Sequence, residues 1–313
     1  MKKCISPFML GATLYMPATR SDLAEIILHG KIPELRSLVV CLEDAVSESD
    51  LEPALMNLDA LLQELSENVG PDEAAQRPLV FIRPRQEEMA AMLVSKYKLT
   101  GIDGFVLPKF THANLSCWWQ ILGSTHLAMM PTLETREVFD VNAMNALAIA
   151  LEQHPARERI VALRIGGNDL MSVISMRRPK NLTLYDGPMG YVVKMLVAVF
   201  APRGFSLTAP VCEQIDNIEL LERELALDIA HGLVGKTAIH PSHLELIHRG
   251  LMVEKEEYED ALRILNSTQA VFKSQGAMCE PATHWRWATS VLERSKHCGI
   301  VKQFDNVFFA TRQ

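Results

Sequence analysis

The sequence predicts an α/β protein, a TIM (β/α)8 barrel with a C-terminal helical extension, on three observations. Short apolar runs alternate with longer amphipathic stretches, which is the pattern of parallel strands joined by helices. Eight such runs precede residue 250, and most of them end in a reactive side chain. An open doubly wound sheet would share this alternation, but no G-x-G-x-x-G sequence follows a strand, and Gly166-Gly167 is too short to count as one.

The expected strands are defined by their apolar runs, with a helix predicted between most of them. The first helix follows Ser21, a favourable N-cap residue, and a long amphipathic helix is expected from Glu48 to Glu67. A polar loop covering residues 70–78 precedes the third strand. The eight strands are expected at Thr13–Met16, Leu38–Leu42, Leu79–Ile82, Phe105–Leu107, Leu127–Leu133, Ile160–Ile165, Phe205–Leu207 and Val234–Ile239.

The pattern changes after Arg249, which divides the chain into a barrel of residues 1–250 and an extension of residues 251–313. Glu254–Lys273 is predicted to be one charged amphipathic helix, Gln275–Pro281 a break, and His284–Lys296 a second helix. Helices with apolar faces must cover something. The extension is therefore expected to be a lid, a subunit-contact arm or a helical layer on the barrel wall.

Composition excludes several classes of protein. The chain has 313 residues, 48% of them hydrophobic and 22% charged, with a net charge of −7 and no basic cluster, so nucleic acid and anionic membranes are not expected partners. The six cysteines are scattered without a C-x-x-C pair, which predicts neither a zinc site nor a disulfide framework. A reducing cytoplasm is the expected location, and no apolar run is long enough for a signal peptide or a membrane span.

Carboxylates end two consecutive expected strands, at Glu134 and Asp169. Neighbouring strands lie about 4.8 Å apart, and two carboxylate oxygens on one Mg²⁺ are about 3 Å apart, so the two side chains can share a cation. This places a metal site at the C-terminal ends of the barrel strands. The alternative reading is that both acids only cap helix N-termini. Other strand exits carry further reactive side chains, for which salt bridges at the rim are the alternative: Glu43, Asp44, Arg83, Lys109 and His240.

Seven segments in the range 12–250 together resemble the beta subunit of citrate lyase and its relatives, the HpcH/HpaI aldolase and malyl-CoA lyase families. The segments occur in the order of the family. They are LYMPATR (Leu14–Arg20), VCLEDAV (Val40–Val46), FIR (Phe81–Arg83), DGFVLPK (Asp103–Lys109), LET (Leu133–Thr135), IGGNDL (Ile165–Leu170) and GKTAIHPS (Gly235–Ser242).

The resemblance implies a role for each matching residue. Glu134 and Asp169 would be the protein ligands of Mg²⁺ or another divalent cation. Glu43 and Asp44 would hold metal-bound water or orient the site as part of the catalytic set. Arg83 would grip a substrate carboxylate or an enolate oxygen, which suits its planar fork of donors.

Further residues of the matching segments are expected to contact the substrate. The backbone at Gly166 and Gly167 would approach a bound keto acid. Arg20 is placed among the substrate-binding residues. Lys109 could stabilise an anion, or form an ion pair with a carboxylate of the rim, such as Glu43 or Glu134.

The activity implied is that of a Mg²⁺-dependent carbon–carbon lyase or aldolase. Its substrate would be derived from a 2-keto acid or resemble an acyl-CoA, and the reaction would pass through a metal-stabilised enolate. A 2-keto acid chelates Mg²⁺ through two oxygens, and the cation polarises the carbonyl. The alternative is a non-catalytic barrel that retains the metal site to bind a carboxylate or a partner protein.

The chain also departs from the family pattern. Asn168 replaces an acid next to Asp169, and Arg177–Tyr185 is an unusually basic loop that either contacts coenzyme A or is solvated. In the family, the tail contacts a neighbouring subunit and supplies an acid/base group. By loose alignment Glu280 would take that role here, in a homo-oligomer such as a trimer or hexamer. The expected partners are thus a small keto acid or acyl thioester and further copies of the chain.

Overall fold

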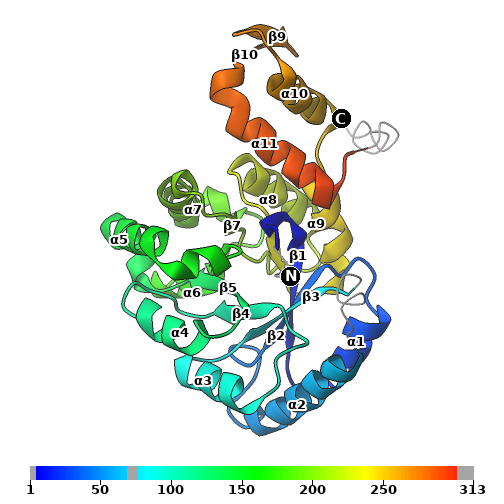
Figure 1. The fold of residues 1–313 in the computed structure, drawn as a ribbon, viewed down its shortest axis with the longest axis vertical. Helices are drawn as coiled ribbons and strands as arrows, with labels where there is room; N and C mark the ends of the chain where they lie inside the picture. The colour runs from blue at the N-terminus through cyan, green and yellow to red at the C-terminus, as the bar shows by residue number, and fades with distance from the viewer. Residues whose placement is uncertain (1–4, 69–76, 302–313) are drawn as a thin grey trace. The chain divides into compact units, whose positions relative to one another are not determined.

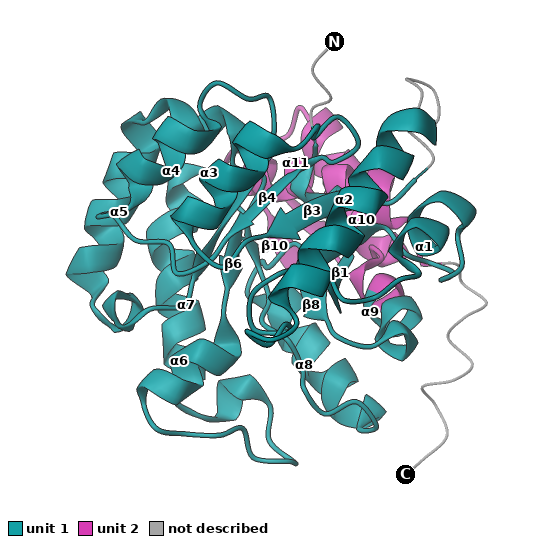
Figure 2. Ribbon diagram, turned by 90° about the horizontal axis from the view of Figure 1, so that it is seen from below, with its two compact units in different colours: residues 1–247 teal, residues 248–313 magenta. Residues whose placement is uncertain are grey.

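The computed structural model describes residues 5–68 and 77–301. These fall into two compact units, which divide between residues 247 and 248 (Figure 2). Unit 1 is built on eight parallel strands, which follow one another in chain order around a barrel (Figure 1). A bridge between Ala209 and Lys236 joins the two ends of the sheet. The strands are β1 (Ala12–Pro17), β2 (Ser37–Cys41), β3 (Leu79–Arg83), β4 (Gly104–Leu107), β5 (Ala128–Leu133), β6 (Leu163–Ile165), β7 (Leu207–Thr208) and β8 (Lys236–Ala238).

Helices of unit 1 connect the strands and cover the outside of the barrel (Figure 1). The predicted TIM-barrel fold is thereby confirmed. In α2 the buried residues Ala54, Leu58, Leu61 and Leu65 recur at helical spacing, so one face packs inward. The helices of unit 1 are α1 (Leu23–His29), α2 (Leu51–Asn68), α3 (Glu87–Lys96), α4 (Leu115–Leu122), α5 (Val141–Gln153), α6 (Gly167–Val173), α7 (Pro188–Phe200) and α8 (Ile218–Ala230), with α9 (Leu244–Leu251) at the boundary.

The barrel interior contains an apolar cluster and, further along the strands, charged side chains. Side chains alternate along a strand, so every second residue faces inward. Val39, Phe81, Val106 and Met130 are fully buried members of one core cluster, and the register pairs Val39 with Phe81 and Val106 with Met130. Two residues further along β3, the inward position is Arg83. The charged side chain of β3 thus lies at its C-terminal end, whereas two buried hydroxyls near the start of β1 and β2, those of Thr13 and Ser37, hydrogen-bond to each other at 3.0 Å.

Several strand boundaries differ from the sequence prediction. The seventh strand is Leu207–Thr208 rather than Phe205–Leu207, and the eighth is restricted to Lys236–Ala238. The sixth begins at Leu163, since Ile160 makes only an isolated bridge. Of the predicted polar loop, residues 70–76 lie outside the described part of the chain.

In the described part of unit 2, two helices and a hairpin follow α9: α10 (Lys255–Asn266), β9 (Phe272–Ser274), β10 (Ala277–Cys279) and α11 (Pro281–Cys298). The prediction of one helix over Glu254–Lys273 is wrong, because α10 ends at Asn266 and β9 follows. The predicted break is a hairpin turn in which Gln275 and Gly276 both have positive φ, the geometry of a type I′ turn. Within the described residues, no helix is both long and apolar enough to cross a membrane.

Candidate active site

Arg83 is the centre of a charged cluster at the C-terminal ends of the barrel strands. It is the last residue of β3 and is only 7% exposed. Its Nη2 lies 2.6 Å from Oε2 of Glu43 and 3.1 Å from Oε1 of Glu134, and its Nη1 lies 3.2 Å from Oδ2 of Asp44. Three carboxylates from two other strand exits thus hold one guanidinium in a fixed orientation.

Lys109 connects two of these carboxylates. Its backbone N–H donates to Oε1 of Glu134 at 2.8 Å, and its Nζ donates to Oε1 of Glu43 at 2.7 Å. The φ angle of Lys109 is +48°, in the left-handed region that residues with a side chain seldom adopt. This conformation turns the amide toward Glu134. The ion pair of Lys109 with a rim carboxylate is confirmed, with Glu43 as the partner.

Gly166 leaves room for the side chain of Glu134. A Cβ atom at Gly166 would lie 2.4 Å from both Cβ and Oε2 of Glu134, which is closer than such atoms approach in proteins. The backbone N–H of Gly166 donates to the carbonyl of Leu133 at 3.1 Å, which fixes the start of α6 against β5. Glycine is therefore required here by close approach, and Asp169 follows in the first turn of α6.

Replacing Gly166 with alanine is expected to displace Glu134 from Arg83 and from the Lys109 amide. Loss of a correctly oriented ligand typically lowers metal affinity by 10- to 100-fold, so a decrease of at least about tenfold is expected in calorimetric titration with Mg²⁺. Gly187→Ala is the matched control, because an added Cβ there meets no atom within 4 Å. Equal affinities of the Gly166→Ala variant and the parent would show that Glu134 is not a ligand.

The acidic side chains of the cluster are held at raised pKa values. Burial raises the pKa of Glu134 to about 7, with the charge of Arg83 opposing and that of Asp169 adding to the rise. Burial also raises the pKa of Glu43 and that of Asp169, the latter with a contribution from Asp44. Burial alone would lower the pKa of Arg83, but the charges of Glu134 and other neighbours raise it above its ordinary value.

Metal-free protein is expected to lose stability as the pH rises through 7. The pKa of Glu134 lies above its ordinary value of 4.5, so the folded state binds the proton more tightly than the unfolded state. The stabilisation is fully present below pH 4.5 and is lost as the pH rises past 7, and it amounts to about 3 kcal/mol.

Urea unfolding in a chelating buffer measures this effect when the parent is compared with Glu134→Gln, which mimics the protonated side chain. The variant should gain stability relative to the parent as the pH rises from 4.5 to 8, because only the parent acquires the buried charge. A difference between the two proteins that stays constant over this range would contradict the raised pKa.

The cluster fits a divalent cation in its charge. Its four carboxylates, when ionised, outweigh Arg83 and Lys109 by two negative charges: Glu43, Asp44, Glu134 and Asp169. Within the described residues, no ion pair holds Asp169 and no three His, Cys, Asp or Glu side chains form a ready metal cage. Mg²⁺ is commonly bound by one or two carboxylates while water supplies the remaining ligands. Glu134 and Asp169 are therefore the pair that could hold it.

Three residues singled out in the sequence make other contacts in the described part of the chain. Arg20 is exposed and forms two hydrogen bonds with Asp22, at 2.9 and 2.8 Å, so its binding role is not supported by a contact with the centre. Glu280 precedes α11 in unit 2, where its backbone N–H donates to Nδ1 of His284. Its acid/base role stays a prediction. His240 is exposed and bonds to Ser242.

The basic loop after α6 is anchored by one of its arginines. Arg178 is buried, pairs with Glu224 at 3.0 Å and donates to the carbonyl of Val211. Arg177 and Lys180 are exposed. Glu224 also accepts from the backbone N–H of Leu184 at 2.8 Å and from Nζ of Lys236 at 2.9 Å. Arg178 thus has a structural partner, and only the other two basic side chains are left for solvent or a ligand.

Lys236 lies at the centre of this second charged group. It is fully buried, and its Nζ also donates to Asp228 at 2.7 Å. The hydroxyl of Tyr185 donates to the same carboxylate at 2.6 Å. Two buried cations therefore face two buried carboxylates, and together they tie the loop to α8 and β8. This network lies outside the Arg83 cluster and has a packing role.

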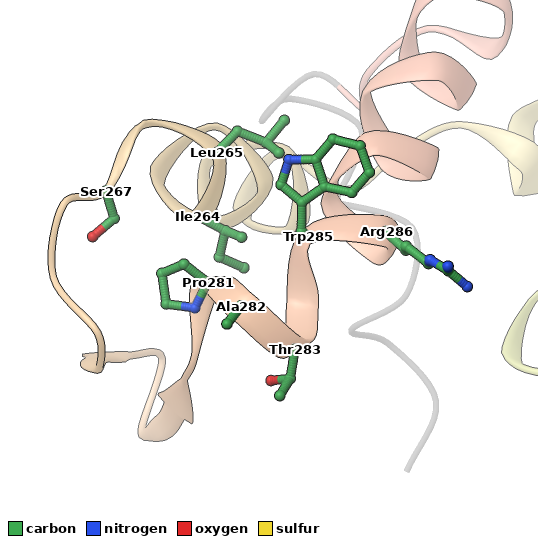
Figure 3. A pocket seen from close by; sticks show the side chains of 8 residues that line it. All are labelled: Ile264, Leu265, Ser267, Pro281, Ala282, Thr283, Trp285 and Arg286. Carbon is green, nitrogen blue, oxygen red and sulfur yellow. The ribbon is translucent and has the colours of Figure 1, made fainter.

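Two further pockets lie elsewhere, one in each unit. In unit 2, a hollow lies between the C-terminal end of α10 and the first turns of α11 (Figure 3), lined by Ile264, Leu265, Ser267, Pro281, Ala282, Thr283, Trp285 and Arg286. It contains no carboxylate, histidine or cysteine. A larger hollow in unit 1 lies at the N-terminal ends of β4, β5 and β6 and includes Tyr97, Asp103 and His126. Its Asp103 is already paired with Arg77 at 2.7 Å.

Sequence reasoning missed two inward-facing residues beside the cluster, Tyr15 and Arg164. Both stand inside predicted strands, where alternation marks which residues face inward but not which of them meet. The guanidinium of Arg164 lies 5.2 Å from the centre of the Tyr15 ring. The sequence contains one signal for Arg164, an arginine within an otherwise apolar strand. Arginine is seldom fully buried without a partner, so its position indicates a special role.

The structure is a TIM barrel with an acidic, arginine-centred cluster at the C-terminal strand ends, which is where the active sites of such barrels lie. The chain belongs to the family of C–C bond lyases of the TIM-barrel fold, which matches residues 4–300. It is accordingly a carbon–carbon lyase, and the resemblance seen in the sequence is confirmed. A search of curated protein sequences finds no significant match.

Solved structures share the fold at low sequence identity. A citrate lyase from Burkholderia xenovorans has a TM-score of 0.67 and 16% identity, with 98% of this chain and 100% of that chain covered. The protein CitE from Mycobacterium tuberculosis, solved with magnesium, acetoacetate and coenzyme A, has a TM-score of 0.63 and 18% identity, with 91% and 98% covered. A Haloferax volcanii malate synthase, in a magnesium and glyoxylate complex, has a TM-score of 0.59 and 16% identity, with 76% and 74% covered.

Proposed function

We propose that the protein is a Mg²⁺-dependent lyase or aldolase that breaks or forms a carbon–carbon bond of a compound derived from a 2-keto acid. The observation that carries the proposal is the buried guanidinium of Arg83, which three carboxylates hold while Asp169 lies within reach of its charge. With Lys109 included, the cluster has an excess of two negative charges when its carboxylates are ionised, which matches a divalent cation. The family supports the reaction class. Structural neighbours crystallised with magnesium and oxaloacetate, acetoacetate or glyoxylate support the choice of cation and substrate.

Each residue of the cluster has its own proposed role. Glu134 and Asp169 hold the cation, which supplies Lewis-acid polarisation of a keto carbonyl when it is bound. Glu43 and Asp44 keep Arg83 in place and accept hydrogen bonds from water at the site. Arg83 stabilises the negative oxygen that forms when the carbon–carbon bond breaks, because its charge is already fixed in position before the reaction. Gly166 leaves room for the side chain of Glu134 and so helps to place that ligand, while approach of the substrate to the backbone at Gly166 and Gly167 stays a prediction.

The finer features of the proposal concern partners. The proposed substrates are a small keto acid and an acyl thioester, which either reacts together with the keto acid or takes its place. Arg177 and Lys180 are exposed basic residues that can contact a phosphate-bearing thioester, whereas Arg178 is committed to Glu224. Assembly into a homo-oligomer, a supply of acid/base chemistry by Glu280 and a cytoplasmic location complete the proposal.

Calorimetric titration tests the proposal directly. Mg²⁺ is titrated first, and then glyoxylate, pyruvate and oxaloacetate are titrated into the Mg²⁺-loaded protein. At least one keto acid should bind only when Mg²⁺ is present. Absence of any Mg²⁺-dependent binding would refute the proposed function. Binding without turnover of any candidate compound would instead favour a carboxylate-binding barrel.

Arg83→Lys is expected to weaken keto-acid binding or turnover although the positive charge is retained. Lysine offers a point charge in place of the planar fork that contacts Glu43, Asp44 and Glu134. Affinity for the keto acid measured with Mg²⁺ present should fall by at least about tenfold, the size of a lost charge-assisted hydrogen bond. A variant that keeps ligand affinity but melts several degrees lower would assign Arg83 a purely structural role.

A further inference from the structure

Beneath the acidic cluster, three inward-facing side chains with hydrogen-bond donors have no part in the site described above. They are Tyr15 of β1, Thr132 of β5 and Arg164 of β6, which we call the donor layer. Thr132 and Arg164 are paired in register on adjacent strands, and Arg164 lies against the ring of Tyr15. Thr132 precedes Glu134 by two residues, so the layer lies one inward position below the carboxylate that would hold the metal.

Arg164 carries a charge that no carboxylate balances. It is 1% exposed, and it donates to the hydroxyls of Thr237 at 2.6 Å and Thr13 at 3.4 Å. Within the described residues it forms no ion pair, whereas Arg83 and Arg178 each pair with buried carboxylates. Arginine does not lose its proton in a protein, so the layer has a permanent positive potential.

The hydroxyls of the layer are available as donors. The Oγ1 atom of Thr132 is buried without a hydrogen-bond partner, and no hydrogen bond to the hydroxyl of Tyr15 is found in the described part of the chain. Burial raises the pKa of Tyr15, while the charges of Arg164 and Arg83 oppose the rise, so the hydroxyl keeps its proton at neutral pH. Tyr15 is half-buried, whereas Arg164 is almost completely buried, and the charges of Arg83 and Glu134 both act on the Tyr15 hydroxyl, which places it close to the acidic cluster.

We propose that the Tyr15 hydroxyl, supported from beneath by Arg164, donates a hydrogen bond to the negatively charged oxygen of the bound substrate. The inference rests on the proposed function and adds a second oxyanion donor to Arg83. Arg164 acts through Tyr15 as a positioning residue, because its guanidinium holds the ring and its charge attracts the anion. A donor fixed in a water-poor barrel stabilises charge that develops during reaction more than charge already present in the ground state.

Binding of oxalate to the Mg²⁺-loaded protein tests the donor without any turnover. Oxalate is a planar dianion that resembles the enolate of a keto acid, whereas pyruvate resembles the ground state. Tyr15→Phe should weaken oxalate binding by at least about tenfold, the size of a hydrogen bond to a charged group. Pyruvate affinity should change by less than about threefold, since the uncharged keto oxygen gains little from the donor. Arg164→Met should show the same selective loss.

Deuterium incorporation into the methyl group of pyruvate, followed by NMR in heavy water, gives the kinetic counterpart. Exchange requires the enolate, so Tyr15→Phe should slow it by about 100-fold. Tyr97→Phe is the matched control, because Tyr97 is also half-buried but lines the hollow at the opposite ends of the strands. If the parent binds both ligands and Tyr15→Phe binds oxalate equally well, the inference alone is overturned. If the parent binds neither ligand with Mg²⁺, the proposed function fails and the inference fails with it.

Discussion

Asp169→Asn is expected to lower the affinity for Mg²⁺ by well over tenfold. The change removes a negative charge from the centre while it preserves the shape of the side chain. Asp169 is half-buried in the first turn of α6, and burial raises the pKa of its carboxyl, so the folded protein holds this charge at a cost that a cation would offset. Isothermal titration of metal-free protein with Mg²⁺ measures the loss.

A matched control separates this effect from a general change of charge. Asp140→Asn alters the charge equally but lies at the N-cap of α5, where the side chain accepts from the backbone N–H of Asn142 and asparagine can do the same. It should leave Mg²⁺ affinity within about twofold, as ion pairs between distant surface groups are largely screened. Unchanged affinity in Asp169→Asn would remove Asp169 from the metal site.

Lys236→Met is expected to destabilise the barrel by about 3–5 kcal/mol, the usual cost of removing one partner from a buried ion pair. Nζ of Lys236 lies 2.9 Å from Glu224 and 2.7 Å from Asp228, and all three side chains are almost completely buried. Without the lysine, Asp228 would keep only the hydroxyl of Tyr185 as a donor. Urea unfolding gives the change in the free energy of unfolding.

The double variant Lys236→Met with Asp228→Asn provides the internal control. Removal of the orphaned charge should restore part of the lost stability, because the penalty arises mainly from an unpaired buried carboxylate. The double variant should thus be more stable than Lys236→Met alone. If Lys236→Met unfolds at the same urea concentration as the parent, the network contributes nothing measurable to stability.

Much of the barrel could be predicted from local sequence, because buried parallel strands are short apolar runs that differ clearly from the helices around them. The third strand was placed within one residue of β3, and the side chain at its end, Arg83, was correctly expected at a strand exit. The neighbours Glu43 and Glu134 follow from the same logic. Carboxyl ends of consecutive parallel strands must lie on the same side of the barrel.

Other features depend on contacts that no local pattern encodes. The pairing of Arg164 with the Tyr15 ring joins β6 to β1, and it follows from barrel closure and register rather than from either strand alone. Arg20 matches the family segment, but Asp22, two residues further on, engages its guanidinium. In unit 2, the charged pattern after Asn266 continued to favour a helix, whereas the positive φ angles at Gln275 and Gly276 produce a hairpin.

The apolar cluster of the barrel interior has a consequence for how this scaffold can change. The side chains of the cluster, Val39, Phe81, Val106 and Met130, contain no polar atom apart from the methionine sulfur. Substitutions there are therefore limited mainly by the side-chain volume that the close-packed interior can hold. Inward positions nearer the strand exits carry charged side chains: Arg83 ends β3, and Nη1 of Arg164 lies 3.9 Å from the sulfur of Met130 at the border of the cluster. Substitutions at the strand exits can therefore change the chemistry of the site while the apolar cluster stays unchanged. A combinatorial library confined to the exit positions should keep a high proportion of folded members.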